Sequence, residues 1–334
     1  MAFGVGLLLA TSAVSIAVAQ GVPIPAATPP INAFTTSEQH YQYLLDAAHG
    51  GTKHTYESVP KWEGQWSPGG NNMFSLFLVD GTMAAAMAPV DAVVKEGVLT
   101  PAYEEAYKAR RAEMVEFGEQ PYDRLTHCEY PGLARWFWEP YTREFVNTPD
   151  QSWFLNDFMN ESRRIYIGAE HMNPYGTHSS TGDSIGFWNG NKLIVNTKYV
   201  LPADYLRGAP LTSNKLETVE IWEMKTLDNG MNRIEVNVTF YDEHALLKPV
   251  TTIYTYNRRP DLENAGARIR NWECETTSNS YEDADGNTNY LLPGDPGYKD
   301  ARGYTAFPEL PGQSRDPNNE ALGADGMPEL EGGQ

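Results

Sequence analysis

Between residues 140 and 285 the sequence is a succession of short extended segments separated by tight turns. Segment 232–241 alternates apolar and polar residues, which is the pattern of a strand with one buried face. Asn189-Gly190 and Asp228-Asn229-Gly230 are typical hairpin turns. Many strands joined by short turns predict a mainly β fold, an antiparallel meander that curls into a barrel or strongly bent sheet of the lipocalin or calycin kind. The expected strands are YTREFVNTP, QSWFLNDF, SRRIYIG, DSIGFWNG, KLIVNTKYV, KLETVEIWEMKTL, MNRIEVNVTFYD, KPVTTIYTYN and ARIRNWECETT.

The clearest hairpin of this series joins residues 183–188 to residues 192–199. On its first strand Asp183 shares a face with Phe187, while Ser184 and Trp188 point to the other side. We expect Trp188 to be buried against neighbouring strands.

Before this region the sequence predicts a smaller N-terminal addition. Residues 37–50 suggest a short helix capped by Ser37, KWEGQWSPGG and FSLFLVDG suggest two strands, and residues 100–118 form a convincing helix that begins at Pro101. The expected organisation is a signal peptide at 1–19, a linker and short helix at 20–60, strands and a helix packed on the barrel at 61–139, the barrel at 140–285, and a Pro/Gly-rich strap or partly disordered tail at 286–334.

The first 20 residues are apolar and uncharged, and Ala17-Val18-Ala19 fits a small-residue cleavage site. This pattern favours export to the periplasm or the extracellular space. A positively charged start is missing, since the first basic residue is Lys53. The alternative is an uncleaved N-terminal membrane anchor, because the apolar stretch is just long enough to span a bilayer.

The formal net charge is -19. Such an acidic surface repels nucleic acid and anionic lipid, so neither is an expected partner. The chain also lacks the glycine-rich phosphate motifs, the H-E-x-x-H zinc motif and the G-x-S-x-G nucleophile elbow. We therefore expect no cofactor and no metal. The sequence leaves the oligomeric state open.

The two cysteines, Cys128 and Cys274, are expected to pair in an exported protein. The alternative is two buried free thiols.

The long loop between two expected strands, from Glu170 to Asp183, collects chemically active side chains. It carries Glu170, His171, Tyr175 and His178, and it leads to Asp183. Long connections in compact domains are usually functional or disordered, and these residues do not suit disorder. We expect this loop to border a pocket, with His178 as the best candidate for proton transfer, Asp183 as its orienting partner, and His171 and Glu170 as further acid–base candidates. The alternatives are histidines that only form hydrogen bonds and a metal site, for which the spacing gives little support.

Further candidates lie on the expected strands. An arginine inside a barrel, such as Arg163, could clamp a carboxylate, although pairing with one of the protein's own acids is the more common outcome. Glu220 shares a strand face with Trp222, where burial would raise the pKa of a carboxyl. Val219 and Ile221 mark the other face, so a solvated outer face for Glu220 is the alternative. Tyr166 and Tyr254 complete the expected ligand-binding set of Arg163, Tyr166, Tyr175, Glu220, Trp222 and Tyr254; simple barrel packing is the alternative for the aromatic residues.

The segment GDSIGFWNGNKLIVNT resembles the GHSIGRWEGDTLVVDT-type hairpin of a group of secreted, largely uncharacterised bacterial proteins. KWEGQW, LTPAYEEAYKARR, DRLTHCEYPGLAR, SRRIYIG and WECE fit the same group in the same order. The resemblance implies export, a β-rich fold and a shared pair of cysteines at Cys128 and Cys274. It implies no catalytic residues, and Asp183 stands where that group often has histidine.

The leading functional hypothesis is an exported protein with a pocket for a small hydrophobic or aromatic molecule, with cofactor-independent lyase, isomerase or hydratase chemistry as one version of it. The alternatives are a non-catalytic lipocalin-like binding protein and an envelope structural or interaction protein. Acidic and basic groups converging in a cavity would favour the enzyme, an apolar cavity the binder, and a filled barrel the structural role.

Overall fold

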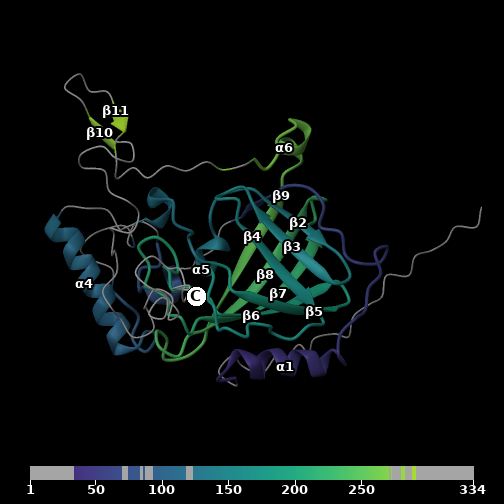
Figure 1. Ribbon diagram of the computed structural model, residues 1–334, viewed down its shortest axis with the longest axis horizontal. Coiled ribbons are helices and arrows are strands. Elements are labelled where there is room, and N and C mark those ends of the chain that lie inside the picture. The colour runs from purple at the N-terminus through teal and green to yellow at the C-terminus, as the bar shows by residue number, and fades with distance from the viewer. Residues whose placement is uncertain are drawn as a thin grey trace, which may run out of the picture.

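The computed structural model describes residues 34–69, 74–82, 86, 93–117, 123–270, 272, 280–282 and 288–290. Nine strands close into a barrel in which neighbours follow the order of the chain (Figure 1). This architecture confirms the mainly β barrel expected from the sequence. The strands are β1 (Trp66–Pro68), β2 (Arg143–Asn147), β3 (Gln151–Asn156), β4 (Ser162–Ile167), β5 (Asp183–Asn189), β6 (Lys192–Lys198), β7 (Glu217–Thr226), β8 (Asn232–Tyr241) and β9 (Val250–Arg258).

Helical segments lie around the barrel. Figure 1 shows α1 along one side of it, α4 at one end and α6 beside the ends of β9 and β2. Two short strands, β10 (Ser280–Glu282) and β11 (Thr288–Tyr290), form a separate two-stranded sheet. The helices are α1 (Ser37–Ala47), α2 (Phe74–Phe77), α4 (Pro101–Phe117), the 3₁₀ helix η2 (Arg124–His127), α5 (Leu133–Trp136) and α6 (Pro260–Asn264).

One pair of neighbouring strands is parallel, which corrects the expected all-antiparallel meander. Ile165 on β4 pairs with Ser184 on β5 in the same chain direction. Parallel neighbours cannot be joined by a tight turn, because the chain must return along the whole strand. Residues 168–182 make that return, and we call them the crossover loop. The length of this segment therefore has a topological cause.

Two N-terminal expectations also differ from the structure. FSLFLVDG contains the helical turn α2 rather than a strand, because Phe74 and Phe77, almost one turn apart, are both buried in the core. The helix α1 is capped by Thr36 and not by Ser37: the Thr36 side chain accepts a hydrogen bond from Gln39 N. Ser37 is instead fully buried.

The barrel occupies a different stretch of the chain from the expected 140–285. It begins at β1 and ends at β9, and Trp66 pairs with Arg258 to close it. β1 takes the edge of β9 beside which the strand at 267–277 was expected. Residues 267–270 are not in a strand, and most of the remaining residues of that segment lie outside the described part of the chain.

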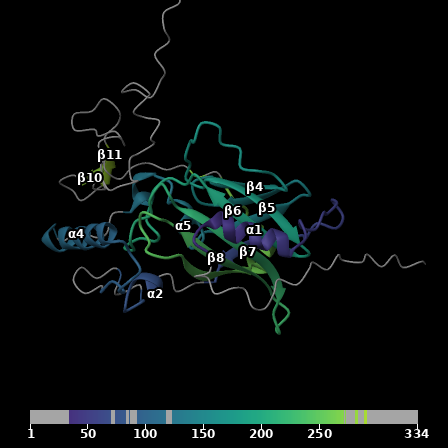
Figure 2. The same ribbon diagram turned by 90° about the horizontal axis from the view of Figure 1, so that it is seen from below.

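The outer face of β5, β6 and β7 is covered by α1. Figure 2 shows α1 lying across these strands. Leu44 of α1 belongs to a small core with Phe187, Ile194 and Val219, which point outward from the barrel. These strands are consequently buried on both faces over much of their length, and β5 and β6 carry the short apolar runs 185–188 and 193–195 rather than a clean alternation.

The middle of the barrel is filled by aromatic side chains. Trp222 is at the centre and is fully buried, and Trp188 is 1% exposed, as expected. Trp136 and Phe137 enter from the α5 segment rather than from a strand. Six ring centroids lie within 6.4 Å of that of Trp222, those of Trp62, Trp136, Phe137, Phe145, Phe154 and Tyr256.

The two ends of the chain carry expectations that the structure does not test. The proposed signal peptide at 1–19 and most of the strap at 286–334 lie outside the described residues. Among the residues that are described, no helix is long and apolar enough to cross a membrane.

No described cysteine is free. Cys128, in the left-handed conformation that follows η2, is disulfide-bonded. Its expected partner, Cys274, lies outside the described residues, so the pairing itself stays a prediction.

Candidate functional site

The crossover loop brings His171, and not His178, to Asp183. His171 Nδ1 lies 2.8 Å from Asp183 Oδ2, and Nε2 lies 2.9 Å from Asn196 Oδ1. Asn196 uses its amide nitrogen on the carbonyl of Thr218 and on Ser37 Oγ, so its oxygen faces the histidine as an acceptor. Both ring nitrogens of His171 are therefore engaged by side chains of the barrel strands, and these contacts fasten the crossover loop to the barrel.

The other loop candidates do not join this pair. His178 Nε2 bonds to the carbonyl of Asn214, its ring meets Tyr199 edge-on, and its buried Nδ1 has no hydrogen-bond partner. Glu170 and Tyr175 are exposed, Tyr175 at 83%. The predicted His178–Asp183 dyad is therefore wrong, because the carboxylate is held by His171.

The loop does border a hollow, of about 360 Å³, between itself and the outer face of β4. Tyr166, Met172 and Asp183 line it, whereas His171 and His178 do not. The loop thus meets the expectation of bordering a hollow, but the proposed proton-transfer residue is not in it.

Inside the barrel, Arg163 and Glu220 form the ion pair that the sequence offered as one alternative. Arg163 Nη1 and Nη2 donate to the two carboxylate oxygens at 2.8 and 2.7 Å. Trp222 Nε1 adds a hydrogen bond to Glu220 of 2.9 Å. Three hydroxyl side chains complete the cluster, those of Ser184, Thr197 and Thr218.

The side chains of this polar cluster are buried and bonded to one another, so they are not accessible to a ligand. Arg163 is 1% exposed and Glu220 is 0% exposed. Phe137 covers it, with the Arg163 guanidinium carbon 5.7 Å from the ring centroid. Tyr254 stacks on the same phenylalanine at 5.1 Å. Of the expected ligand-binding residues, Arg163, Glu220, Trp222 and Tyr254 are therefore parts of a packed interior.

A more open region lies where β1 and β2 separate, which we call the seam. The two strands share only one residue pair, Trp66 with Arg143. Before Trp66 the chain turns away at Gly64, whose φ of +97° favours glycine. Gln65 N then bonds to Glu263 at 3.0 Å rather than to β2. The segment 61–65 is thus held against the region after β9, and it leaves β2.

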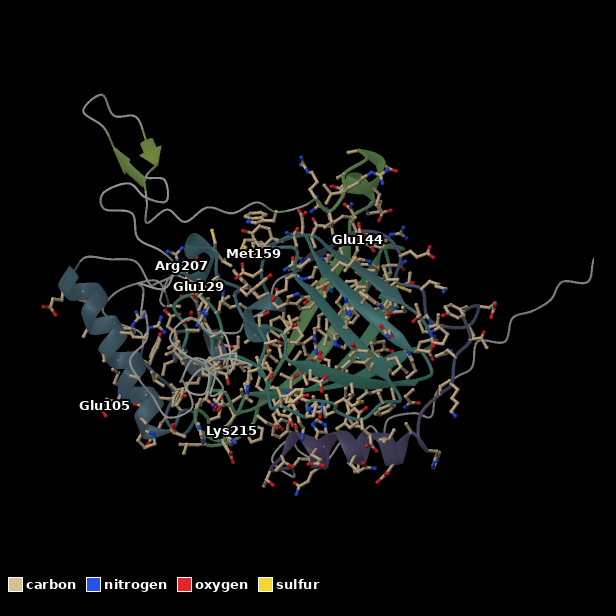
Figure 3. All side chains as sticks on the ribbon, viewed as in Figure 1. Glu105, Glu129, Glu144, Met159, Arg207 and Lys215 are labelled. Atoms are coloured by element: carbon tan, nitrogen blue, oxygen red, sulfur yellow. The ribbon has the colours of Figure 1, made fainter. Side chains whose placement is uncertain are left out.

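The divergence opens a hollow of about 600 Å³, which lies within the usual size of small-molecule sites. We call it the seam hollow. Figure 3 places Glu144, one of its wall residues, near α6. Its walls are residues 61–65 and 144–147, with Arg258, Glu263 and residues 266–268.

Two buried lining residues of the seam hollow carry polar atoms without hydrogen-bond partners. Trp62 is 1% exposed and its Nε1 donor is unpaired; Asn147 is 6% exposed and its Oδ1 acceptor is unpaired. Phe145, 3% exposed, adds a buried aromatic side chain to the lining. Buried polar atoms are almost always satisfied in folded proteins, so these two atoms have hydrogen-bonding capacity that the described residues do not use. The sequence analysis missed these residues, and nothing in KWEGQW or REFVN marks them.

A second group of unsatisfied atoms lies at the opposite end of β2. Glu161 is 4% exposed, and neither of its carboxyl oxygens makes a hydrogen bond. Burial raises the pKa of Glu161 to about 7, although Ser180, Asn156 and the positive charge of Arg143 lower it in part. Arg143 Nε and Asn156 Nδ2 are also unpaired. Glu161 is the strongest perturbed acid that the sequence analysis did not select.

Within the part of the chain that is described, no group of three or more His, Cys, Asp or Glu side chains could hold a metal ion.

Comparisons with known proteins give little more. No family model matches the chain, and no curated protein matches it. Among solved structures, the crystal structure of a point mutant of the fluorescent protein UnaG matches with a TM-score of 0.25 and 14% identity, over 60% of this chain and 96% of that one. Similarity at this level does not establish a shared fold, so the fold class rests on the closed barrel itself.

Proposed function

We propose that this protein binds a small, largely apolar molecule that carries an aromatic group. We propose the seam hollow as its binding site. The observation that carries the proposal is the combination of Trp62, Phe145 and Asn147 in one hollow of suitable volume. Both rings are almost fully covered, at 1% and 3% exposed, and the unpaired Trp62 Nε1 and Asn147 Oδ1 are buried beside them. We propose that the ligand displaces part of the wall formed by residues 61–65, and that these groups then supply an apolar contact, one donor and one acceptor.

The filled lumen favours this site over a ligand inside the barrel. A lipocalin-like binder needs space where this protein has Trp222 and its six aromatic neighbours. Acid–base catalysis has less support, because His171 is engaged on both sides and His178 has no carboxylate beside it. We therefore propose a binding protein that is exported to the periplasm or beyond, with no reaction of its own.

The proposal can be tested with 8-anilino-1-naphthalenesulfonate, an amphipathic aromatic probe whose fluorescence rises on binding. Val146 lines the hollow on the outer face of β2 and is 47% exposed. The substitution Val146→Trp fills the hollow without disturbing the core. We expect this variant to bind the probe at least about tenfold more weakly than the unmodified protein, which corresponds to about 1.4 kcal/mol.

Ile253→Trp is the matched control. Ile253 is also β-branched, lies on the outer face of β9 and is 55% exposed. It is not among the residues that line the seam hollow. We expect this control to bind the probe as the unmodified protein does. Equal binding by both variants, or no binding by the unmodified protein, would refute the proposal.

A further inference from the structure

The hollow beside the crossover loop, which we call the crossover hollow, is walled almost entirely by polar side chains. Its volume of about 360 Å³ lies within the usual range of small-molecule sites. One wall is the outer face of β4, and the other is the crossover loop with the start of β5. Among the described lining residues, Met172 and Gly182 alone lack a polar side-chain group. Five lining residues carry hydroxyl groups on short side chains, namely Ser162, Thr177, Ser179, Thr181 and Ser184.

Arg164 brings hydrogen-bond donors to this hollow from the outer face of β4. It is exposed, and its guanidinium carbon lies 4.3 Å from the centroid of the Trp153 ring on the neighbouring strand β3. Stacking of this kind engages the flat face of the guanidinium and leaves the N–H donors at its edge. Within the described chain Arg164 forms no ion pair and no hydrogen bond. Its donors are therefore accessible to a ligand.

Asp183 brings acceptors to the same hollow from the start of β5. Its Oδ2 lies 2.8 Å from His171 Nδ1, and its side chain is 21% exposed. The bond to His171 holds the carboxylate in one orientation. Its second oxygen, Oδ1, accepts no hydrogen bond from any described residue. A fixed acceptor thus shares the hollow with the donors of Arg164.

The loop wall of the crossover hollow is held in place by its own hydrogen bonds. Asn173 Nδ2 donates to Thr177 O at 2.6 Å, and Asn173 Oδ1 accepts from Thr177 N at 2.9 Å. Ser179 N donates to Tyr199 O at 3.0 Å, which ties the loop to the end of β6. A ligand that enters a wall already ordered in this way loses little free energy in ordering it.

We propose that the crossover hollow is a binding site for a neutral carbohydrate. The hydroxyl groups of a sugar both donate and accept hydrogen bonds, so they match Arg164 as donor, Asp183 as acceptor and the lining hydroxyls in either role. Tyr166, 38% exposed, offers an aromatic surface to the C–H groups of the sugar ring.

Other classes of small molecule match this lining less well. An apolar ligand would cover the polar groups of the wall without replacing their hydrogen bonds to water. An anion would meet the Asp183 carboxylate in a chain whose net charge is -19, and a cation would meet Arg164. The inference is independent of the proposed function, because no residue lines both the crossover hollow and the seam hollow.

The site is tested by titrating the isotope-labelled full chain with D-glucose, D-galactose and N-acetyl-D-glucosamine, each separately, and following the backbone amides by NMR. We expect at least one sugar to give saturable shifts with a Kd of about 1 mM or tighter. The largest shifts should belong to β4 and the crossover loop, at Arg164 and Thr181 among others. No saturable shift with any of the three sugars, or saturable shifts confined to another part of the molecule, would overturn the proposal.

The variant Arg164→Gln removes the charged donors from the outer face of β4. We expect it to bind the same sugar at least about tenfold more weakly than the unmodified protein. Arg233→Gln is the matched control, because Arg233 lies on the outer face of β8, bonds to Asn257 and does not line the hollow. This control should bind the sugar as the unmodified protein does. Equal affinities of the two variants would contradict the site.

A second variant, Ser162→Trp, tests the same hollow by filling it. Ser162 is exposed at the start of β4, so the larger side chain does not enter the core. We expect sugar binding to be lost in this variant and kept in Val146→Trp, which fills the seam hollow instead. The opposite pattern would place the sugar in the seam hollow and refute the crossover site.

D-Glucuronate distinguishes a neutral sugar from an anion as the ligand. It keeps the ring hydroxyls of D-glucose and adds a carboxylate. We expect it to bind no more tightly than the neutral sugars. Binding at least about tenfold tighter than that of D-glucose, lost in Arg164→Gln, would show that the hollow selects a carboxylate and would remove the neutral carbohydrate as its ligand.

Discussion

Glu161 is a carboxylic acid buried with no hydrogen bond to either oxygen, and this has a predictable effect on stability. Its pKa in the folded protein is about 7, against an ordinary value of 4.5. The folded state therefore holds the proton more tightly than the unfolded state does. The resulting stabilisation is fully present below pH 4.5 and is lost as the pH rises to 7, for a total of about 3 kcal/mol.

We accordingly expect Glu161→Gln to remove this pH dependence. The amide stays neutral, so the variant should exceed the unmodified protein in free energy of unfolding at pH 8, and the difference should shrink towards pH 5. Urea unfolding at the two pH values measures it. Glu170→Gln, which changes an exposed carboxylate, is the control and should leave the difference between the two pH values unaltered. A Glu161→Gln profile parallel to that of the unmodified protein would contradict the expectation.

The sequence predicted the environment of some single residues but not the partners of others. Burial of Trp188 was expected from its place on a strand, and the alternation of strand faces put Glu220 on the same face as Trp222, which is a local property. The alternation did not decide which face of that strand is inner. The partner of Asp183 could not be chosen in this way. Both histidines lie in the same loop, and the choice depends on how residues 168–182 cross the barrel. Trp62 and Asn147 meet only because β1 leaves β2, which no local pattern records.

At the scale of elements, the Arg163–Glu220 cluster joins four neighbouring strands. Arg163 comes from β4, Ser184 from β5, Thr197 from β6 and Glu220 from β7. A buried ion pair of this kind fixes which strands are neighbours, but it need not add net stability, because both charges lose their hydration.

We expect Glu220→Leu to destabilise the protein by about 3–5 kcal/mol, because it leaves Arg163 charged and unpaired in the interior. The double variant Arg163→Met, Glu220→Leu should recover most of that loss. Urea unfolding of both variants measures the difference. A double variant that is less stable than Glu220→Leu alone would show that the pair itself contributes net stability.

The elements were predicted better than their connections. Eight of the expected strands are present as β2 to β9, because hairpin turns and strand periodicity are encoded within a few residues. The parallel pairing of β4 and β5 was missed, because the sequence of a long loop does not distinguish a functional loop from a crossover connection. The entry of α5 into the barrel end was missed for a similar reason: LARW is too short to show a helical period.

For the whole molecule, the main untested link is between the segment that connects β1 to β2 and the segment that follows β9. A disulfide between Cys128 and Cys274 would join the two and close a long loop, with a stabilisation of about 4–5 kcal/mol. We expect no reactive thiol when the denatured, unreduced protein is titrated, and a large drop in the free energy of unfolding for Cys128→Ser. Two reactive thiols per chain would rule the disulfide out.

The parallel crossover also bears on the order in which the barrel assembles. Strands β5 to β9 form a continuous series of antiparallel neighbours, so each can nucleate on the one before it at a small cost in loop-closure entropy. The crossover interrupts this series at β4, and the closing pair of Trp66 with Arg258 has the greatest sequence separation of all. Contacts of that kind form late. Mutations in β5 to β9 should therefore slow refolding, while mutations at the seam should mainly speed unfolding, so the seam would be the last part of the barrel to close.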